Sequence, residues 1–308
     1  AGSLTSQGAS DAGGIGDFNY IESGFLALCT SNMSDITIGP GQDEQASDNF
    51  NTAIWTGNNA NNRAIAVGFQ PDFSWTQTRT QYGNGSELFD SVRGAGKSLK
   101  SETTAAEVTN KSSGYIGAFT STGFTTADGS SSNSSINYND GGGQSYIAWN
   151  WKAGTAFSND ASATGVGTID SSGQVNETAG FSIVKYTGLG NTDQQTISVG
   201  LSWSGKDKLV IIKNRDASTN WLVNSSLLAA NKVLRLNTTD NDSQVNSSGY
   251  ITYETFGFKT YNGSNILNLA NDYIAYCFHS VEGYSKIGTY VGNGNADGTF
   301  VFTGFRPA

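Results

Sequence analysis

The single histidine of the chain offers the first chemical possibility. His279 follows Cys277 by two positions, so both side chains share one face if this stretch is a strand, and a Cys–His pair can serve as nucleophile and base. Neighbours two apart on a strand run parallel, roughly 6–7 Å apart at the backbone, which suits a hydrogen bond poorly. An internal repeat places Asn150 and Lys152 at these two positions, and no third residue orients the pair. We therefore expect a structural histidine.

Carboxylate pairs are the second possibility, because glycoside hydrolysis needs two acids at a fixed separation, best held on rigid strands. The expected strands contain almost no acids. Asp72, Glu87 and Asp90 flank aromatic residues, and we interpret all three as solvated loop charges. The glycine-rich stretch Gly94–Ser98 lacks the Gly-x4-Gly-Lys spacing of a phosphate loop. We expect no enzymatic activity.

Metal and thiol chemistry are weakly represented. Asp240 and Asp242 lie in the densest group of loop oxygens and are weak calcium candidates, since they lack the spaced acids and closing glutamate of an EF-hand. No other cofactor is expected. The two cysteines, Cys29 and Cys277, have no metal-binding spacing around them. Two buried free thiols are the expectation, and a disulfide between them stays open.

The composition indicates which elements must position any site. Gly, Ser, Thr and Asn are abundant, aromatic residues reach 11% and charged residues only 14% of the 308 residues. Disordered chains have fewer aromatic and more charged residues, and helical proteins need more good helix formers. The net charge of −9 and the absence of basic runs argue against nucleic acid as a partner. No apolar run approaches the length of a membrane span, so no membrane insertion is expected. The composition predicts a β protein with many polar loops.

An internal repeat organises the chain. Four strings recur in one order, at separations between 127 and 135 residues, with these pairs: Phe50–Gly57 and Phe181–Gly188, Val67–Phe69 and Val199–Leu201, Ser112–Ile116 and Ser247–Ile251, Tyr146–Trp151 and Tyr273–Phe278. A repeat of this length is the size of a whole domain, which favours tandem antiparallel β-sandwiches over a β-helix or a propeller. Gly288–Gly292 and Thr303–Phe305 repeat the opening strings a third time.

Strand periodicity predicts a core face in each repeat. Ile147, Trp149 and Trp151 share one face of a strand, as do Ile274, Tyr276 and Phe278 in the second repeat. We expect these faces to form the two cores. Thr104–Val108 could hold a short helical turn.

The repeat also predicts domain boundaries. Residues 1–48 are interpreted as the end of an upstream sandwich or an N-terminal segment, 49–154 as the first sandwich, 155–180 as a linker or long loop, and 181–284 as the second sandwich. Residues 285–308 are either the opening hairpin of a third repeat or closing strands of the second. We favour the first interpretation, in which the chain is part of a longer array.

Several strings together resemble a known group of proteins. Phe89–Leu99, Thr104–Val108, Tyr273–Lys286 and Thr303–Pro307 are similar to tandem repeats in virion proteins of tailed phages, especially marine ones. Residues 16–20 and 24–29 resemble the last strands of a SPRY-like sandwich that often precedes such repeats. The resemblance implies lectin-like jelly-roll domains of concanavalin type in a tail fibre, head fibre or other appendage, located at the surface of a virion. One departure is Ser202–Gly205, where the other two copies have Gln70-Pro71 and Arg306-Pro307.

Four functions follow as hypotheses. The first is a phage appendage protein that contacts host-surface glycans through sandwich loops, with Tyr82 and Trp221 as contact residues because both stand in polar, loop-like settings. The second is an architectural capsid decoration or fibre spacer without a ligand. The third is a bacterial surface adhesin, and the fourth a glycan hydrolase. The expected partners are other virion proteins, further copies of the chain in a homo-oligomer, and host-surface glycan.

Overall fold

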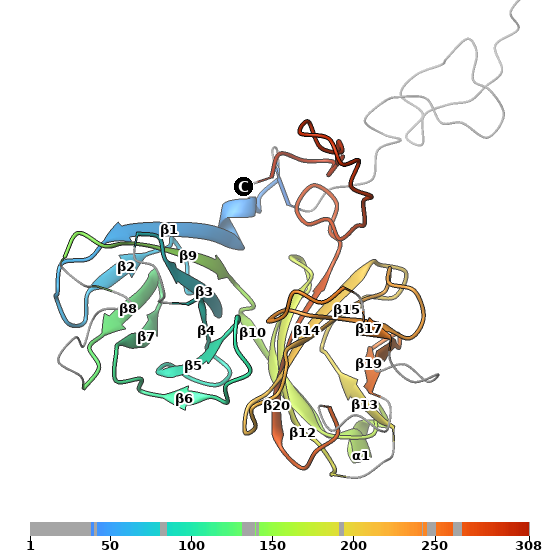
Figure 1. Cartoon of the computed structure of the whole chain (residues 1–308). Helices are drawn as coiled ribbons and strands as arrows, with labels where there is room; N and C mark the ends of the chain where they lie inside the picture. The colour runs from blue at the N-terminus through green and yellow to red at the C-terminus, as the bar shows by residue number, and fades with distance from the viewer. Residues whose placement is uncertain are drawn as a thin grey trace, which may run out of the picture.

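The computed structural model describes residues 38–39, 42–80, 85–130, 139, 142–190, 194–241, 251–260 and 267–307, with the backbone of 243–244. The regular elements in these ranges are almost all β-strands, and the paired strands within the sheets run antiparallel. The predicted all-β sandwich architecture is confirmed. Figure 1 shows two sandwiches side by side, the first built from β1–β9 and the second from β10–β20.

The first sandwich consists of a six-stranded sheet and a three-stranded sheet. A short 3-10 helix, Ala46–Asp48, precedes it. The larger sheet has the order β1-β9-β3-β4-β5-β6, with bounds β1 Phe50–Thr56, β9 Ser145–Trp151, β3 Phe73–Thr78, β4 Glu87–Asp90, β5 Lys97–Lys100 and β6 Val108–Thr109. The smaller sheet has the order β2-β8-β7, with bounds β2 Ala64–Ala66, β8 Gly123–Ala127 and β7 Tyr115–Thr120. Trp55, Tyr146 and Phe124 are among the buried side chains between the two sheets.

The second sandwich repeats this plan with additional strands. Its larger sheet has the order β10-β11-β12-β20-β14-β15-β16-β17, with bounds β10 Thr155–Asn159, β11 Ser171–Asn176, β12 Phe181–Thr187, β20 Asp272–His279, β14 Lys208–Asn214, β15 Leu222–Ser225, β16 Lys232–Arg235 and β17 Ser243–Gln244. Its smaller sheet has the order β13-β19-β18, with bounds β13 Gln195–Ser198, β19 Gly257–Thr260 and β18 Ile251–Tyr253. The core between them includes Trp203, Phe258 and Tyr273.

The interpretation of residues 155–180 as a linker or long loop is wrong. β10 and β11 form a hairpin that extends the larger sheet beyond β12, and the short helix α1 (Ala161–Thr164) lies between them. Asp160 caps that helix through a hydrogen bond from Ala163 N. The polar composition reflects an edge position, where one strand border and much of one face meet water. The second sandwich therefore begins at Thr155.

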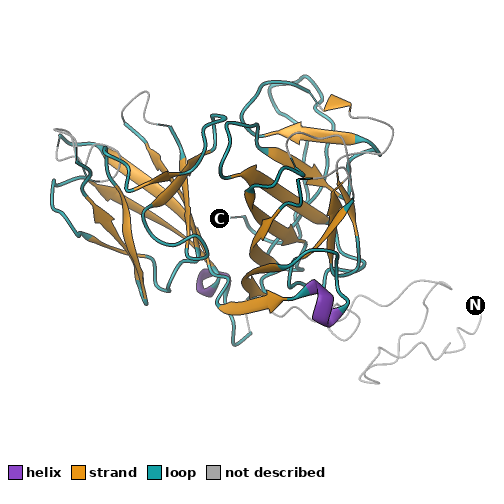
Figure 2. Cartoon of the chain, turned by 90° about the horizontal axis from the view of Figure 1, so that it is seen from below, coloured by secondary structure: helices purple, strands orange, loops and turns teal. Residues whose placement is uncertain are grey.

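A third apolar cluster joins the two sandwiches. It combines Phe73, Leu88 and Leu99 of the first larger sheet with Ile183, Ile274 and Tyr276 of the second. Rings interlock across the junction, with Phe73 and Tyr276 centroids 4.2 Å apart and Trp151 and Phe181 centroids 6.4 Å apart. The two larger sheets thus face each other, and each has a smaller sheet on its other side. Figure 2 shows the same pair from below.

This arrangement corrects the predicted core faces. In β9 the buried residues are Tyr146, Ala148 and Asn150, whereas Ile147, Trp149 and Trp151 are only partly buried. In β20 the face of Ile274, Tyr276 and Phe278 belongs to the junction, and the opposite face of Tyr273, Ala275 and Cys277 fills the sandwich core. Of the repeated faces, Trp151 in the first sandwich and Ile274, Tyr276 and Phe278 in the second therefore join the sandwiches. Both faces of β20 are covered, so apolar residues occur on both.

The two remaining predictions of local structure are resolved by the described residues. The segment Thr104–Val108 has no helical turn and runs extended toward the second sandwich. Residues 286–307 contain no assigned strand and lie outside both sandwiches (Figure 1).

Candidate functional site: a polar cleft between the sandwiches

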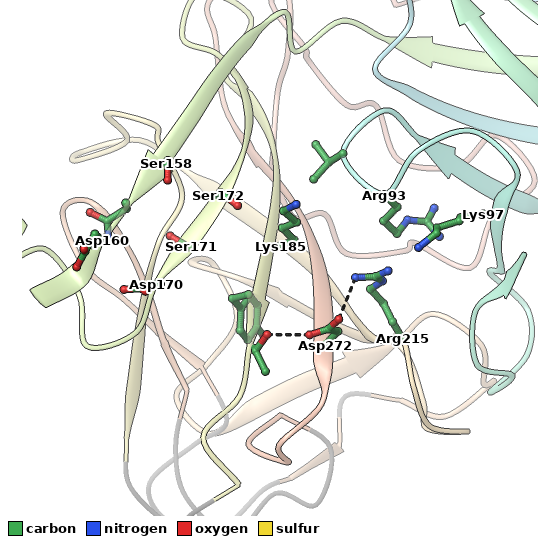
Figure 3. Close-up of a pocket in the computed structure, with 14 residues that line it drawn as sticks. Arg93, Lys97, Ser158, Asp160, Asp170, Ser171, Ser172, Lys185, Arg215 and Asp272 are labelled. Carbon is green, nitrogen blue, oxygen red and sulfur yellow. Dashed lines mark hydrogen bonds and ion pairs between the residues drawn. The ribbon is translucent and has the colours of Figure 1, made fainter.

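A cleft of about 530 Å³ opens where the two sandwiches meet. The first sandwich contributes the turn after β4 and the start of β5, and the second contributes β10, β11, β12 and the ends of β14 and β20. Figure 3 shows its charged and hydroxyl side chains. The lining residues are Val92, Arg93, Lys97, Ser158, Asn159, Asp160, Asp170, Ser171, Ser172, Lys185, Tyr186, Thr187, Arg215 and Asp272.

A buried arginine forms the floor of the cleft. The Arg93 side chain is fully buried, and its Nε donates to Asp90 Oδ2 at 2.6 Å while Nη2 donates to Leu88 O at 2.9 Å. Tyr276 Oη of the second sandwich donates to the same Asp90 oxygen at 2.7 Å and accepts from Arg93 Nη2 at 3.2 Å. Burial raises the pKa of Tyr276 well above its ordinary value, so the hydroxyl stays a donor. This polar network crosses the junction.

Glu107 links the floor to the rim. Arg215 donates to it twice, from Nε at 2.9 Å and from Nη2 at 3.0 Å, and Arg93 Nη1 donates at 3.2 Å. Burial alone would raise the pKa of the Glu107 carboxyl, but the hydrogen bond from Arg215 and the charge of Arg93 lower it below the ordinary value. The carboxylate is therefore ionised and fixes both guanidinium groups.

The segment that holds Glu107 is anchored by the second sandwich at two further points. Lys213 Nζ donates to Thr104 O at 3.1 Å and to Ala217 O and Thr219 O on its own side. Burial lowers the pKa of Lys213 to about 8. Trp221 Nε1 donates to Lys100 O at 2.8 Å. These contacts keep the cleft walls at a fixed separation.

Cationic groups and oxygens both line the cleft. Lys97, Lys185 and Arg215 present the cationic groups, and Ser158, Ser172, Asp160 and Asp170 of the second sandwich present oxygens, with Ser172 directly beside Lys185 on the neighbouring strand (Figure 3). Lys97 Nζ lies 3.6 Å from Glu107 Oε1. Lys185 is exposed and forms no ion pair with any residue that the structure describes. Hydrogen bonds from Ser162 and Ala163 lower the pKa of Asp160. Among the described residues, the cleft therefore offers one cation without an ion pair, Lys185, beside hydroxyl and carboxylate acceptors of the same sandwich.

The predicted contact residues do not meet at this cleft. Trp221 is fully buried at the junction, so the expectation of a surface ring that contacts a ligand is wrong; its indole Nε1 donates to Lys100 O of the first sandwich instead. Tyr82 lies outside the described residues, as does Asp242. Asp240 is exposed and pairs with Arg235 at 3.1 Å. Within the described part of the chain, no group of three His, Cys, Asp or Glu side chains could hold a metal ion.

The acids interpreted as solvated are buried. Asp72 Oδ2 accepts from the backbone amides of Ala153 and Gly154, Asp90 is held by Arg93, and Glu87 pairs with Lys111. All three are at most 3% exposed. Their neighbours in sequence indicated loops, but each charge has a fixed partner that compensates its burial. These acids brace the first sandwich and none of them lines the cleft.

The surroundings of Cys277 and His279 on β20 are those of structural residues. Cys277 is a free, fully buried thiol whose pKa is raised by burial to a value far from that of a thiolate nucleophile. His279 is 4% exposed, and its Nδ1 lies 2.9 Å from Ser280 O. Burial lowers the pKa of His279, which keeps the ring neutral. Cys29 lies outside the described residues.

Comparison with known proteins gives one match. The family described as Domain of unknown function (DUF7483) matches residues 45–308, which include both sandwiches and the C-terminal segment. The chain belongs to this family. No curated protein and no solved structure matches the chain. One DUF7483 match thus spans the whole pair of sandwiches, consistent with the extensive junction between them. No helix in the described ranges is long and apolar enough to cross a membrane.

Sequence reasoning missed most of the cleft residues of this DUF7483 chain. Lys185 is the only charged residue within Phe181–Thr187, so the sequence of β12 could have indicated that its side chain points outward. Arg93, Glu107 and Arg215 gave no such signal, because they are far apart in sequence and meet only through the packing of two sheets. Chemically, the cleft can bind a polar ligand by charge and hydrogen bonds.

Proposed function

We propose that this chain is a non-enzymatic structural protein of a phage virion appendage, a tail or head fibre, and that it contacts host-surface glycans. The resemblance of Phe89–Leu99 and Tyr273–Lys286 to repeats of tailed-phage virion proteins supports the appendage part. The tight junction between the sandwiches supports a structural role, since polar and aromatic contacts hold the two units together. Other virion proteins and further copies of the chain are its proposed partners, and the virion surface its proposed location.

The observation that carries glycan contact is the cleft. Sugar hydroxyls require paired donors and acceptors, and acidic sugars require a cation. Lys185 and Lys97 supply cationic donors, Ser172 supplies a hydroxyl beside Lys185 on the neighbouring strand, and Asp160 and Asp170 supply carboxylate oxygens (Figure 3). The only aromatic lining residue, Tyr186, has its ring buried in the second sandwich. The favoured ligand is therefore an acidic glycan bound through charge and hydrogen bonds, not through stacking.

A glycan array probed with the full chain, displayed in multiple copies on beads, tests this function. We expect binding to glycans that carry uronic or sialic acid carboxylates, weakened by rising salt because exposed charges are screened.

The matched pair of variants is Lys185→Ala in the cleft and Lys206→Ala at an exposed position outside it. Loss of a charge-assisted contact is expected to weaken binding about tenfold for Lys185→Ala and to leave it unchanged for Lys206→Ala. Equal effects of the two variants on glycan binding would mean that the glycan does not contact Lys185. Absence of binding to every glycan and to host cells would contradict the adhesion function.

The second candidate is a purely architectural spacer or capsid decoration. It is favoured by the buried network of Arg93, Asp90 and Tyr276, which holds the sandwiches together without requiring a ligand. Cryo-electron microscopy of the intact particle distinguishes the two functions. Regular positions on the capsid together with a negative glycan array support the spacer, whereas a distal position on a fibre supports adhesion.

A further inference from the structure

The C-terminal segment exposes large apolar side chains. The exposed fractions are 69% for Tyr290, 85% for Val291, 88% for Phe300 and 77% for Phe302. These residues follow β20 and belong to neither sandwich core (Figure 1). Contiguous exposed apolar residues of this kind mark an interaction surface.

The sequence of this segment matches two consecutive strands of the second sandwich, β12 and β13, which lie in different sheets and pair with β20 and β19. Ile287–Phe305 aligns without a gap with Ile183–Leu201, the stretch that contains β12 and β13. Seven of the 19 positions are identical: Ile287, Tyr290, Gly292, Gly294, Asn295, Asp297 and Gly304 match Ile183, Tyr186, Gly188, Gly190, Asn191, Asp193 and Gly200. The first sandwich shares the aromatic residue and the two glycines of this pattern (Trp55, Gly57 and Gly68) in Thr52–Phe69, which is one residue shorter between the glycines.

At two glycines the backbone of the segment has the same left-handed φ as its counterpart in β12–β13. Gly294 has φ +67° where Gly190 has +70°, and Gly304 has φ +84° where Gly200 has +73°. Gly68 of the first sandwich, at the position of Gly304, has φ +105°. Left-handed φ values at equivalent glycines show that the local conformation is shared although no strands are paired here.

Tyr290 lacks the contact that its counterparts make. Tyr186 stacks on Tyr273 with ring centroids 5.0 Å apart, and Trp55 stacks on Tyr146 at 5.4 Å. In both cases the partner ring lies on the last strand of the sandwich, which pairs directly with the strand that carries Tyr186 or Trp55. No ring contact of Tyr290 occurs within the described chain. The acceptor strands of this chain are also occupied, because β9 lies between β1 and β3 and β20 between β12 and β14.

We propose that Ile287–Phe305 is a strand donor: it supplies to a further sandwich of the same kind the two strands that β12 and β13 supply to the second sandwich, one to each sheet, and the first of them pairs with that sandwich's last strand. The partner is a sandwich without its own counterpart of β12 and β13, whose last strand offers an aromatic ring to Tyr290. Strand addition would satisfy backbone groups and bury the exposed apolar side chains in one step. Such a joint links successive sandwiches into an extended array.

The test grafts the segment into an acceptor that this chain contains. In the full chain, Ala53–Phe69 is replaced by Gly288–Phe305. The first sandwich is the suitable host because Ala64 and Ala66, the counterparts of Phe300 and Phe302, are exposed and leave room for larger side chains. Hydrogen exchange of the β9 amides reports whether the grafted segment pairs with β9, as β1 does in the parent chain.

The expected result is cooperative unfolding and exchange of the β9 amides within about tenfold of the parent chain. A graft with the same residues in scrambled order is expected to exchange at least about a hundredfold faster. In the graft that also contains Tyr290→Ser, the β9 amides should exchange at a rate between those of the unscrambled and scrambled grafts, because the ring stacked on Tyr146 is lost. If the unscrambled graft exchanges as fast as the scrambled one, the segment cannot replace β1 and β2 and the proposal is overturned.

Discussion

At the scale of single residues, the junction depends on charges that are buried together with their partners. Arg93, Asp90 and Tyr276 satisfy one another inside an apolar cluster, and Glu107 neutralises Arg93 and Arg215 at its edge. Removing one partner leaves the others buried and unsatisfied, which costs more than the bond itself. The polar residues therefore fix how the two larger sheets are positioned.

Tyr276→Phe isolates one such contact. The variant keeps the ring that stacks on Phe73 but removes the donor to Asp90, so we expect a loss of about 2 kcal/mol in the free energy of unfolding. Urea unfolding measures this change. Tyr115→Phe is the control, because Tyr115 is only partly buried and an unchanged stability within about 0.5 kcal/mol is expected. Similar values for both variants would contradict a special role of Tyr276.

Alkaline pH should destabilise the protein. Burial raises the pKa of Tyr273 to about 12 and those of Tyr186 and Tyr276 further, whereas unfolded tyrosines ionise near 10. Above pH 10 the unfolded chain thus binds fewer protons than the folded one, and stability falls as the pH rises. Lys213 acts oppositely between about pH 8 and 10.5, because its lowered pKa favours folding as the pH rises.

Urea unfolding between pH 8 and 12, with absorbance at 295 nm to follow tyrosine ionisation, measures this dependence. We expect the decline to begin only above pH 10 and to coincide with cooperative tyrosine ionisation. Independent ionisation of these tyrosines near pH 10 in a chain that stays folded would contradict their burial.

At the scale of elements, the hairpin β10–β11 is the part of the fold that the sequence predicted least well. Gly173 in β11 lies against β12, where a Cβ atom would come within 1.8 Å of Ile183 O. Backbone atoms cannot yield to such a clash without opening the strand pair. The glycine is therefore required by close strand approach, not by a turn.

Gly173→Ala tests the assignment of 155–180 to the second sandwich. We expect a loss of about 3 kcal/mol or more in the free energy of unfolding, measured by urea denaturation. Gly288→Ala is the matched control, since nothing lies within 4 Å of the added Cβ and its φ is not in the left-handed region. A neutral effect of Gly173→Ala would mean that β11 does not pair with β12.

At the scale of the whole molecule, two sandwiches share a third core. Trp221 fills that junction, makes no contact with solvent and donates to Lys100 O of the other sandwich. A junction with this much buried apolar and polar contact makes each sandwich depend on the other, so the pair should unfold in a single transition.

Trp221→Ala is expected to uncouple the pair. Loss of the buried ring should lower the stability of the junction by about 3–5 kcal/mol and split the calorimetric unfolding profile into two transitions. Trp149→Ala serves as control, because its ring is only partly buried and lies outside the cluster that joins the sandwiches. A single unfolding transition of Trp221→Ala at the midpoint temperature of the parent chain would show that the junction contributes little to stability.

The sequence by itself determined the strands, the repeat and the all-β class. These depend on local signals: alternation in Tyr146–Trp151 and Tyr273–Phe278, and a composition rich in small polar and aromatic residues. Local periodicity also placed Cys277 and His279 on one face of β20. Such features need only neighbouring residues, so they can be read from a single chain.

Only the tertiary structure decided which face of each strand meets which partner. Period-2 alternation separates two faces but does not identify the covering layer, and in β20 both faces are buried, one by the smaller sheet and one by the other sandwich. For the same reason Trp221 became part of the junction, and Lys185 came to face Lys97 across a cleft. Contacts between sheets join residues more than a hundred positions apart, and their free energy depends on the packing of the whole molecule.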